Sequence, residues 1–185
     1  MWQKYSDYLS PRLELIPLFI LALAFYLAAS NYSALPDAFP SSFGSGGNVR
    51  EWGSRNMVFL YPGLSLLIYL VVTGISIAMA VTENPKRLIN MPPSWKERLT
   101  NRQTEELRAS LVRYLFVLKV IILGLLAYLL YGSIEVALGK AEGIGSVPSS
   151  LLIVAIGIFV ALMVWKMVRL VFGKDRDEDN TDGSI

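Results

Sequence analysis

Two charged side chains, Glu14 and Lys119, lie at the start of one apolar stretch and within another. A lysine near the centre of a membrane helix costs about 2.5–3.5 kcal/mol on the insertion scale, so a compensating partner is expected. Glu14 enters its stretch at a similar depth from the same membrane face, and an ion pair would link the two helices. The alternative is that Lys119 extends toward the lipid headgroups beside Arg113.

A second set of polar residues follows a helical spacing in another apolar stretch. Ser65, Tyr69, Thr73 and Ser76 are separated by four, four and three positions, which places them on one face of a helix. Hydrogen bonds between helices, worth about 0.6 kcal/mol each, are one interpretation of this polar stripe. A polar transport path is the other.

The sequence does not assemble the groups that catalysis requires. It contains no cysteine and no histidine, so a metal site would need carboxylates alone, which suit Mg, Ca or Mn. The carboxylates expected on the outer face, at Asp37, Glu51, Glu135 and Glu142, do not form an activated nucleophile or a positioned acid and base. We therefore predict a protein that is not an enzyme and has no cofactor, no metal and no nucleic-acid partner.

The elements that carry these residues are predicted to be membrane helices. The chain has 185 residues, 54% of them hydrophobic, and a mean hydropathy of +0.47, above the usage of about 45–50% in soluble domains. A bilayer crossing needs about 20 apolar residues. The predicted fold is an all-α, integral membrane four-helix bundle, with spans at about 13–30, 57–81, 111–134 and 147–168. A cleaved signal peptide is the alternative for the first span, but its preceding residues carry only Lys4 and Arg12 as cations, which favours a retained helix.

The basic residues predict the orientation of these spans. Twelve of the seventeen lie before span one, between spans two and three, or at or beyond the end of span four, whereas only Arg50, Arg55 and Lys140 fall on the other side. We expect a multi-pass protein of the cell membrane, with both termini and the basic loop 82–110 cytoplasmic and the loop 31–56 extracytoplasmic. The tail 173–185 is predicted to be disordered. Within the basic loop, Ser94 to Arg108 is interpreted as an interfacial helix with Trp95 at headgroup depth, or as the beginning of helix three.

The extracytoplasmic loop contains several turn signals and, after its first turn, the aromatic residues Phe39, Phe43 and Trp52. Prolines in Leu35-Pro36-Asp37 and at Pro40 favour extended backbone, and Asp37 is expected to bond its own turn. The segment Ser45-Gly46-Gly47-Asn48 supplies positions that tolerate positive φ. Phe39, Phe43 and Trp52 are predicted to form a small apolar lid over the outer mouth of the bundle.

The order of these residues resembles the extracytoplasmic loop of the SdpI-type family. The resemblance rests on Leu35-Pro36-Asp37, Pro40, Phe43, a glycine-rich turn and Trp52-Gly53-Ser54-Arg55 directly before a membrane helix, and continues with Asn84-Pro85, Asn90-Met91-Pro92 and Asn101-Arg102-Gln103. It covers roughly residues 30–125. Ser42 and Gly44 stand where the family usually has histidine and asparagine, so any family role that needs an imidazole is absent.

The resemblance implies immunity to a secreted toxin and signalling through a cytoplasmic repressor held at the membrane. We therefore expect a binding, immunity and signalling module for an extracytoplasmic peptide or lipid, with Pro36, Asp37, Pro40, Phe43, Trp52 and Arg55 as candidate ligand or partner residues. The alternative is a non-catalytic accessory or structural subunit of a larger membrane assembly, such as a transporter. Small residues Gly124 and Gly157 would suit a dimer face, although four helices can also close a bundle alone.

Overall fold

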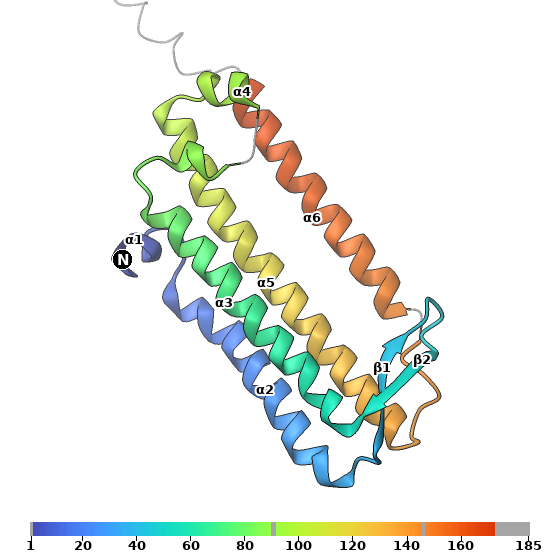
Figure 1. Cartoon of the computed structure of the whole chain (residues 1–185). Helices are drawn as coiled ribbons and strands as arrows, with labels where there is room; N and C mark the ends of the chain where they lie inside the picture. The colour runs from blue at the N-terminus through green and yellow to red at the C-terminus, as the bar shows by residue number, and fades with distance from the viewer. Residues whose placement is uncertain (1, 90–91, 146, 173–185) are drawn as a thin grey trace, which may run out of the picture.

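Long helices run side by side along the molecule, with a β-hairpin at one end and two short helices at the other (Figure 1). The computed structural model describes residues 2–89, 92–145 and 147–172. The long helices are α2 (Leu15–Asn31), α3 (Leu60–Val81), α5 (Asn101–Ala137) and α6 (Val147–Phe172). The short helices α1 (Trp2–Ser6) and α4 (Pro93–Arg98) lie at the end away from the hairpin. The predicted disorder of 173–185 falls outside the described residues.

Within the described residues, three helical segments are long and apolar enough to cross a membrane. They cover Pro11–Ala34, Arg55–Val81 and Asn101–Ala137, and less than a third of the apolar window in each is buried inside the protein. Such extensive exposed apolar surface is typical of helices solvated by lipid rather than by water. The helix α6 lies at the position of the fourth predicted span.

Short 3₁₀ helices precede two of the predicted spans. η1 (Pro11–Glu14) leads into α2, and η3 (Arg55–Phe59) leads into α3. Pro17 and Pro62 both lie in the first turn of their α-helix, where the missing backbone N–H has no partner to lose. The prolines therefore mark helix starts without interrupting the helices.

The helix α5 begins ten residues before the predicted start of span three. Thr100 is its N-cap: the Gln103 amide N–H donates to the Thr100 hydroxyl at 3.2 Å, and the Thr100 N–H donates to the Gln103 side chain at 3.0 Å. This reciprocal capping box satisfies two of the amides that a helix N-terminus leaves open. Because Leu99 is extended, α4 is a separate helix, and Ser94 to Arg108 is not the single helix that one interpretation expected.

The chain is mostly helical, as predicted, and the loop between α2 and α3, for which no strands were predicted, folds as an antiparallel hairpin. Strand β1 (Ala38–Phe43) pairs with β2 (Val49–Ser54), with register shifts around Ser42. The Gly44 N–H donates to the Asn48 carbonyl at 2.9 Å, and Gly47 adopts a φ of 80° in the turn between the strands. Pro40 is tolerated because a two-stranded sheet consists of edge strands.

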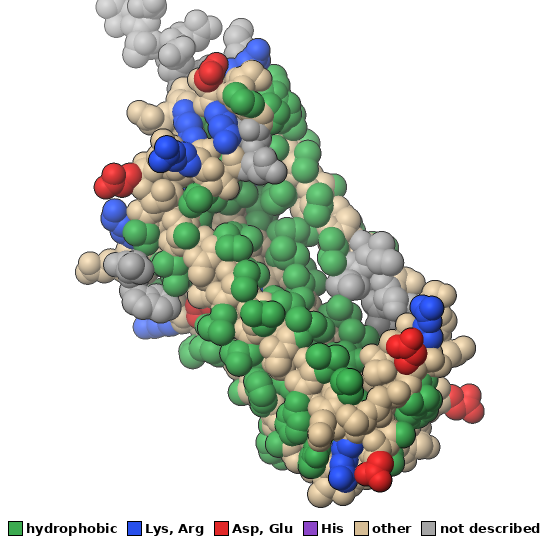
Figure 2. All heavy atoms as spheres, in the orientation of Figure 1, with side chains coloured by type: hydrophobic (Ala, Val, Ile, Leu, Met, Phe, Trp, Pro, Cys, Tyr) green, Lys and Arg blue, Asp and Glu red, His purple; other side chains and the backbone are tan. Residues whose placement is uncertain are grey.

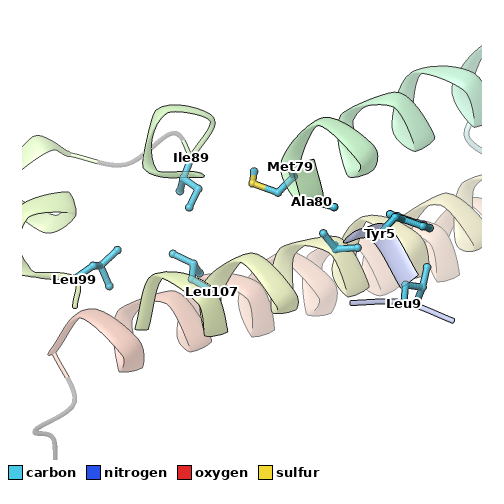
Figure 3. Packing of buried hydrophobic residues seen from close by; sticks show 8 residues of the cluster. Tyr5, Leu9, Met79, Ala80, Ile89, Leu99 and Leu107 are labelled. Carbon is cyan, nitrogen blue, oxygen red and sulfur yellow. The ribbon is translucent and has the colours of Figure 1, made fainter. Parts of the chain in front are cut away.

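The helix α5 is the central element, packing against α2, α3 and α6, and α2 and α3 also pack against each other. Two buried apolar clusters fill the ends of this arrangement. The cluster at the hairpin end comprises Ala24, Ala28, Leu35, Phe39, Val58, Leu130 and Ile134. The cluster at the α4 end comprises Tyr5, Leu9, Met79, Ala80, Ile89, Leu99, Leu107 and Val112 (Figure 3).

Candidate functional site

The structure brings Glu14 and Lys119 together in the interior of the helix bundle. Lys119 Nζ lies 2.7 Å from Glu14 Oε2 and 2.8 Å from Oε1, and the exposed fractions of the two residues are 0% and 5%. The third ammonium N–H donates to Thr73 Oγ1 at 2.9 Å. All three donors of the lysine are thus occupied. The alternative in which Lys119 extends to the headgroups does not fit its complete burial.

The N-terminal helix α1 contributes the next contact of this cluster. The Tyr5 hydroxyl, in a fully buried side chain, donates to Glu14 Oε1 at 2.7 Å. Burial raises the pKa of Tyr5, and its hydrogen bond to the Glu14 carboxylate raises it further, so the phenol stays neutral and can donate. The segment before the first membrane helix is therefore held by the same carboxylate that holds Lys119.

Two aromatic rings complete the surroundings of the lysine. Lys119 Nζ lies 4.9 Å from the centre of the Tyr69 ring and 5.7 Å from that of Phe116, both within cation–π range. We call Tyr5, Glu14, Tyr69, Thr73 and Lys119 the buried charge cluster. Because the carboxylate and the ammonium each have several partners, this arrangement suits a link between α1, η1 at the start of α2, α3 and α5 better than a proton-transfer site.

The predicted polar stripe on α3 faces the protein interior, but two of its four hydroxyls bond their own helix. Ser65 Oγ donates to the Tyr61 carbonyl and Ser76 Oγ to the Val72 carbonyl, each at 2.8 Å and each one turn back along α3. The interpretation as hydrogen bonds between helices is therefore wrong for these two serines and holds for Thr73. A transport path along the stripe stays a prediction.

Asp37 and Arg55 close the base of the hairpin. The Arg55 N–H donates to the Asp37 carbonyl at 2.8 Å, and Arg55 Nη2 lies 3.7 Å from Asp37 Oδ1. Arg55 Nη1 donates to the Leu35 carbonyl at 3.4 Å, and its guanidinium lies 4.9 Å from the centre of the Tyr32 ring. Asp37 thus pairs with the arginine that follows β2, and that it bonds its own turn stays a prediction.

The aromatic residues of the hairpin do not form the predicted apolar lid. Phe39 is completely buried in the cluster with Val58 and Leu130, so it anchors the hairpin from below. Phe43 is half-buried, whereas Trp52, opposite Pro40 in the sheet, is 55% exposed. Of the other candidate residues, Pro40 is buried and Pro36 is exposed.

The tip of the hairpin is joined to the connection between α5 and α6, a contact that was not predicted from the sequence. The Ile144 N–H donates to the Gly47 carbonyl at 2.9 Å, and Asn48 forms a β-bridge with Gly143. A Cβ at Gly47 would lie 2.2 Å from the Gly145 carbonyl oxygen, so the two backbones approach too closely for a side chain. The paired glycines at 143 and 145 are the signal in the sequence that could have suggested this approach.

Two cations of the predicted basic loop, residues 82–110, form hydrogen bonds with backbone carbonyls at the α4 end. Lys86 Nζ donates to the Leu99 carbonyl at 2.7 Å, and Arg108 Nη2 donates to the Thr82 carbonyl at 2.7 Å. Arg108 Nη1 also donates to the Tyr8 hydroxyl at 3.1 Å. A polar pocket of about 360 Å³ opens beside them, lined by Glu83, Asn84, Pro85, Lys86, Asn101, Thr104 and Glu105. Among the described residues, no group of three or more acidic side chains could hold a metal ion.

Comparisons with protein-family models, with curated proteins and with solved structures found no match to this chain. The SdpI-type resemblance therefore stays a prediction that rests on the residues quoted for it.

Proposed function

We propose that this chain is a four-span membrane protein of the SdpI type that acts as a non-catalytic binding, immunity and signalling module. Its ligand would be an extracytoplasmic peptide or lipid, with both termini on the cytoplasmic side of the cell membrane. The observation that best supports this proposal is the hairpin: a folded element between two membrane helices that presents Trp52 on an exposed strand face.

The hairpin is held at three points, so a ligand that displaces it would act on several helices. Its base is closed by Asp37 and Arg55, its underside is anchored by Phe39, and its tip is bonded to the connection between α5 and α6 at Ile144. An extended peptide could also bind along a strand edge, a common mode of peptide recognition. Exposed indoles such as that of Trp52 are frequent binding hot spots.

Signalling requires a second contact on the cytoplasmic side and two states that differ in ligand affinity. In the basic loop, Arg87 is exposed, so it remains accessible to a soluble repressor while Lys86 and Arg108 hold the fold. The buried charge cluster is suited to transmit a displacement, because one carboxylate and one ammonium join α1, η1 at the start of α2, α3 and α5.

Expression in toxin-sensitive cells tests the immunity function. We expect survival in the presence of toxin, and loss of survival for Trp52→Ala at an unchanged protein level in the membrane. Tyr131→Ala, which also truncates a half-exposed aromatic residue, is the control and should protect like the wild type. Unchanged killing of cells that contain the wild-type protein in their membrane would rule out immunity.

A second function, as an accessory or structural subunit of a larger membrane assembly, is supported by the outward face of α6. Val154, Ile158, Leu162 and Trp165 recur at helical spacing and are all exposed, while α6 packs on α5. Another membrane protein could cover this face. Stable co-purification of one partner, lost when Ile158 and Leu162 are changed to tryptophan, would favour this function over the immunity module.

A further inference from the structure

Arginine and aromatic side chains from α4 and α6 converge at the end of the molecule away from the hairpin. The rings of Trp95 and Phe172 meet edge to face with centres 5.2 Å apart, and the Arg98 guanidinium lies 5.5 Å from the centre of the Phe172 ring. On α6, the Arg169 guanidinium lies 5.7 Å from the centre of the Trp165 ring. We call these five residues the arginine–aromatic patch.

The patch is open to its surroundings. Trp165 and Phe172 are 61% and 51% exposed, and both arginines are exposed. Trp165, Arg169 and Phe172 follow spacings of four and three, so they share one face of α6. Among the described residues, no carboxylate lies within 4.0 Å of the Arg98 or Arg169 guanidinium. Their charges are therefore available to an external anion.

The position of the patch places it at the boundary between lipid and water. Its α6 residues lie in the last two turns of that helix, where the exposed apolar face of Val154, Ile158 and Leu162 ends. Tryptophans prefer this depth in membrane proteins, where their rings meet the headgroups. On the face seen in Figure 2, most Lys and Arg side chains lie at the same end of the molecule, with acidic side chains among them, and fewer lie at the hairpin end.

We infer that the arginine–aromatic patch binds the phosphate headgroup of an anionic phospholipid. A guanidinium offers parallel N–H donors that match two phosphate oxygens, and its planar face can remain on an aromatic ring while it does so. The acyl chains of the same lipid would lie along the apolar face of α6. This continuity of a cationic site with an apolar surface favours a lipid over a soluble phosphate compound. The inference does not depend on the proposed function.

Lipid titration of the purified full chain tests this inference. The protein is held in uncharged detergent micelles, and tryptophan fluorescence is followed as dioctanoyl phosphatidylglycerol or dioctanoyl phosphatidylcholine is added. We expect the anionic lipid to bind more tightly, and Arg98→Gln/Arg169→Gln to weaken its binding by about fivefold per arginine removed. Arg50→Gln/Lys140→Gln makes the same charge change at the hairpin end and should leave the affinity unchanged.

Two further arms make the result decisive. Arg98→Lys/Arg169→Lys keeps the charge and loses the planar contact, so its affinity for the anionic lipid should fall between those of the wild type and the glutamine variant. If the glutamine variant melts at a lower temperature, the lysine variant tests the patch in its place. Inorganic phosphate at matched ionic strength should not compete. Equal binding of both lipids, equal weakening by the two glutamine double variants, or full competition by inorganic phosphate would each overturn the inference.

Discussion

Lys119 brings a positive charge into the bundle interior, and the surrounding side chains determine whether that charge is tolerated. Its three N–H groups are bonded to Glu14 and Thr73, and Glu14 is bonded in turn by Tyr5. The sequence identified Glu14 as the candidate partner from its depth alone. It did not identify Thr73 or Tyr5 as members of the same cluster, because their contacts depend on how α1 and α3 are rotated against α5.

Removing one charge of this pair should destabilise the protein far more than removing both. We expect Lys119→Met to lower the free energy of unfolding by about 3–5 kcal/mol, because it leaves the Glu14 carboxylate buried without its counter-charge. The double variant Glu14→Gln/Lys119→Met should recover most of that loss. Denaturant titration of the protein in micelles measures both, and a double variant that is no more stable than the single one would contradict the pairing.

Gly47 should be sensitive to the smallest possible side chain. Its φ of 80° disfavours any residue with a Cβ by about 1–2 kcal/mol, and the added carbon would also collide with the Gly145 carbonyl. We expect Gly47→Ala to lower the melting temperature and to free the hairpin tip. Gly46→Ala is the matched control, since its Cβ would meet no atom closer than 3.9 Å. Equal melting temperatures for the two variants would contradict this account.

At the scale of elements, hydropathy predicted the long apolar helices. In lipid, backbone N–H and C=O groups can bond only to each other, so a long apolar segment is expected to be helical. It placed span three at 111–134, although α5 begins at Asn101, because the first turns of α5 are polar and their start is set by a cap. The hairpin was not predicted, because Pro40 and the weak β-propensity of β1 and β2 do not indicate strands. The Ser45–Asn48 turn between two aromatic-bearing segments was the available signal.

The cap of α5 can be tested separately from its packing. Thr100→Ala removes the hydroxyl that accepts from the Gln103 N–H, and we expect a loss of about 1 kcal/mol in the free energy of unfolding. Hydrogen exchange should increase in the first turn of α5 and remain unchanged near Lys119. Ser94→Ala, at an exposed position in α4, is the control and should have little effect. Uniform exchange along α5 in the Thr100 variant would argue against a local capping role.

At the scale of the whole molecule, the asymmetric charge distribution predicts which end faces the cytoplasm. The chain has no cysteine, so a single introduced thiol reports one position without interference. We expect Ser45→Cys, in the hairpin turn, to react with an impermeant reagent in intact cells, and Ser94→Cys, in α4, to react only after lysis. The reversed pattern would invert the topology and remove the support for extracytoplasmic ligand binding.

Because α5 is longer than the hydrocarbon layer is thick, lipid surrounds one part of it and water the other. Thirty-seven residues of helix extend roughly 55 Å, against about 30 Å of hydrocarbon, so a substantial part of α5 projects from the bilayer unless it tilts steeply. The part of the apolar cluster formed by Ile89, Leu99 and Leu107 then lies on this projection as a small core outside the hydrocarbon, next to the hydrogen-bonded cations of the basic loop (Figure 3). Heating should therefore melt this projection separately from the lipid-embedded helices, in a transition that depends little on acyl-chain length.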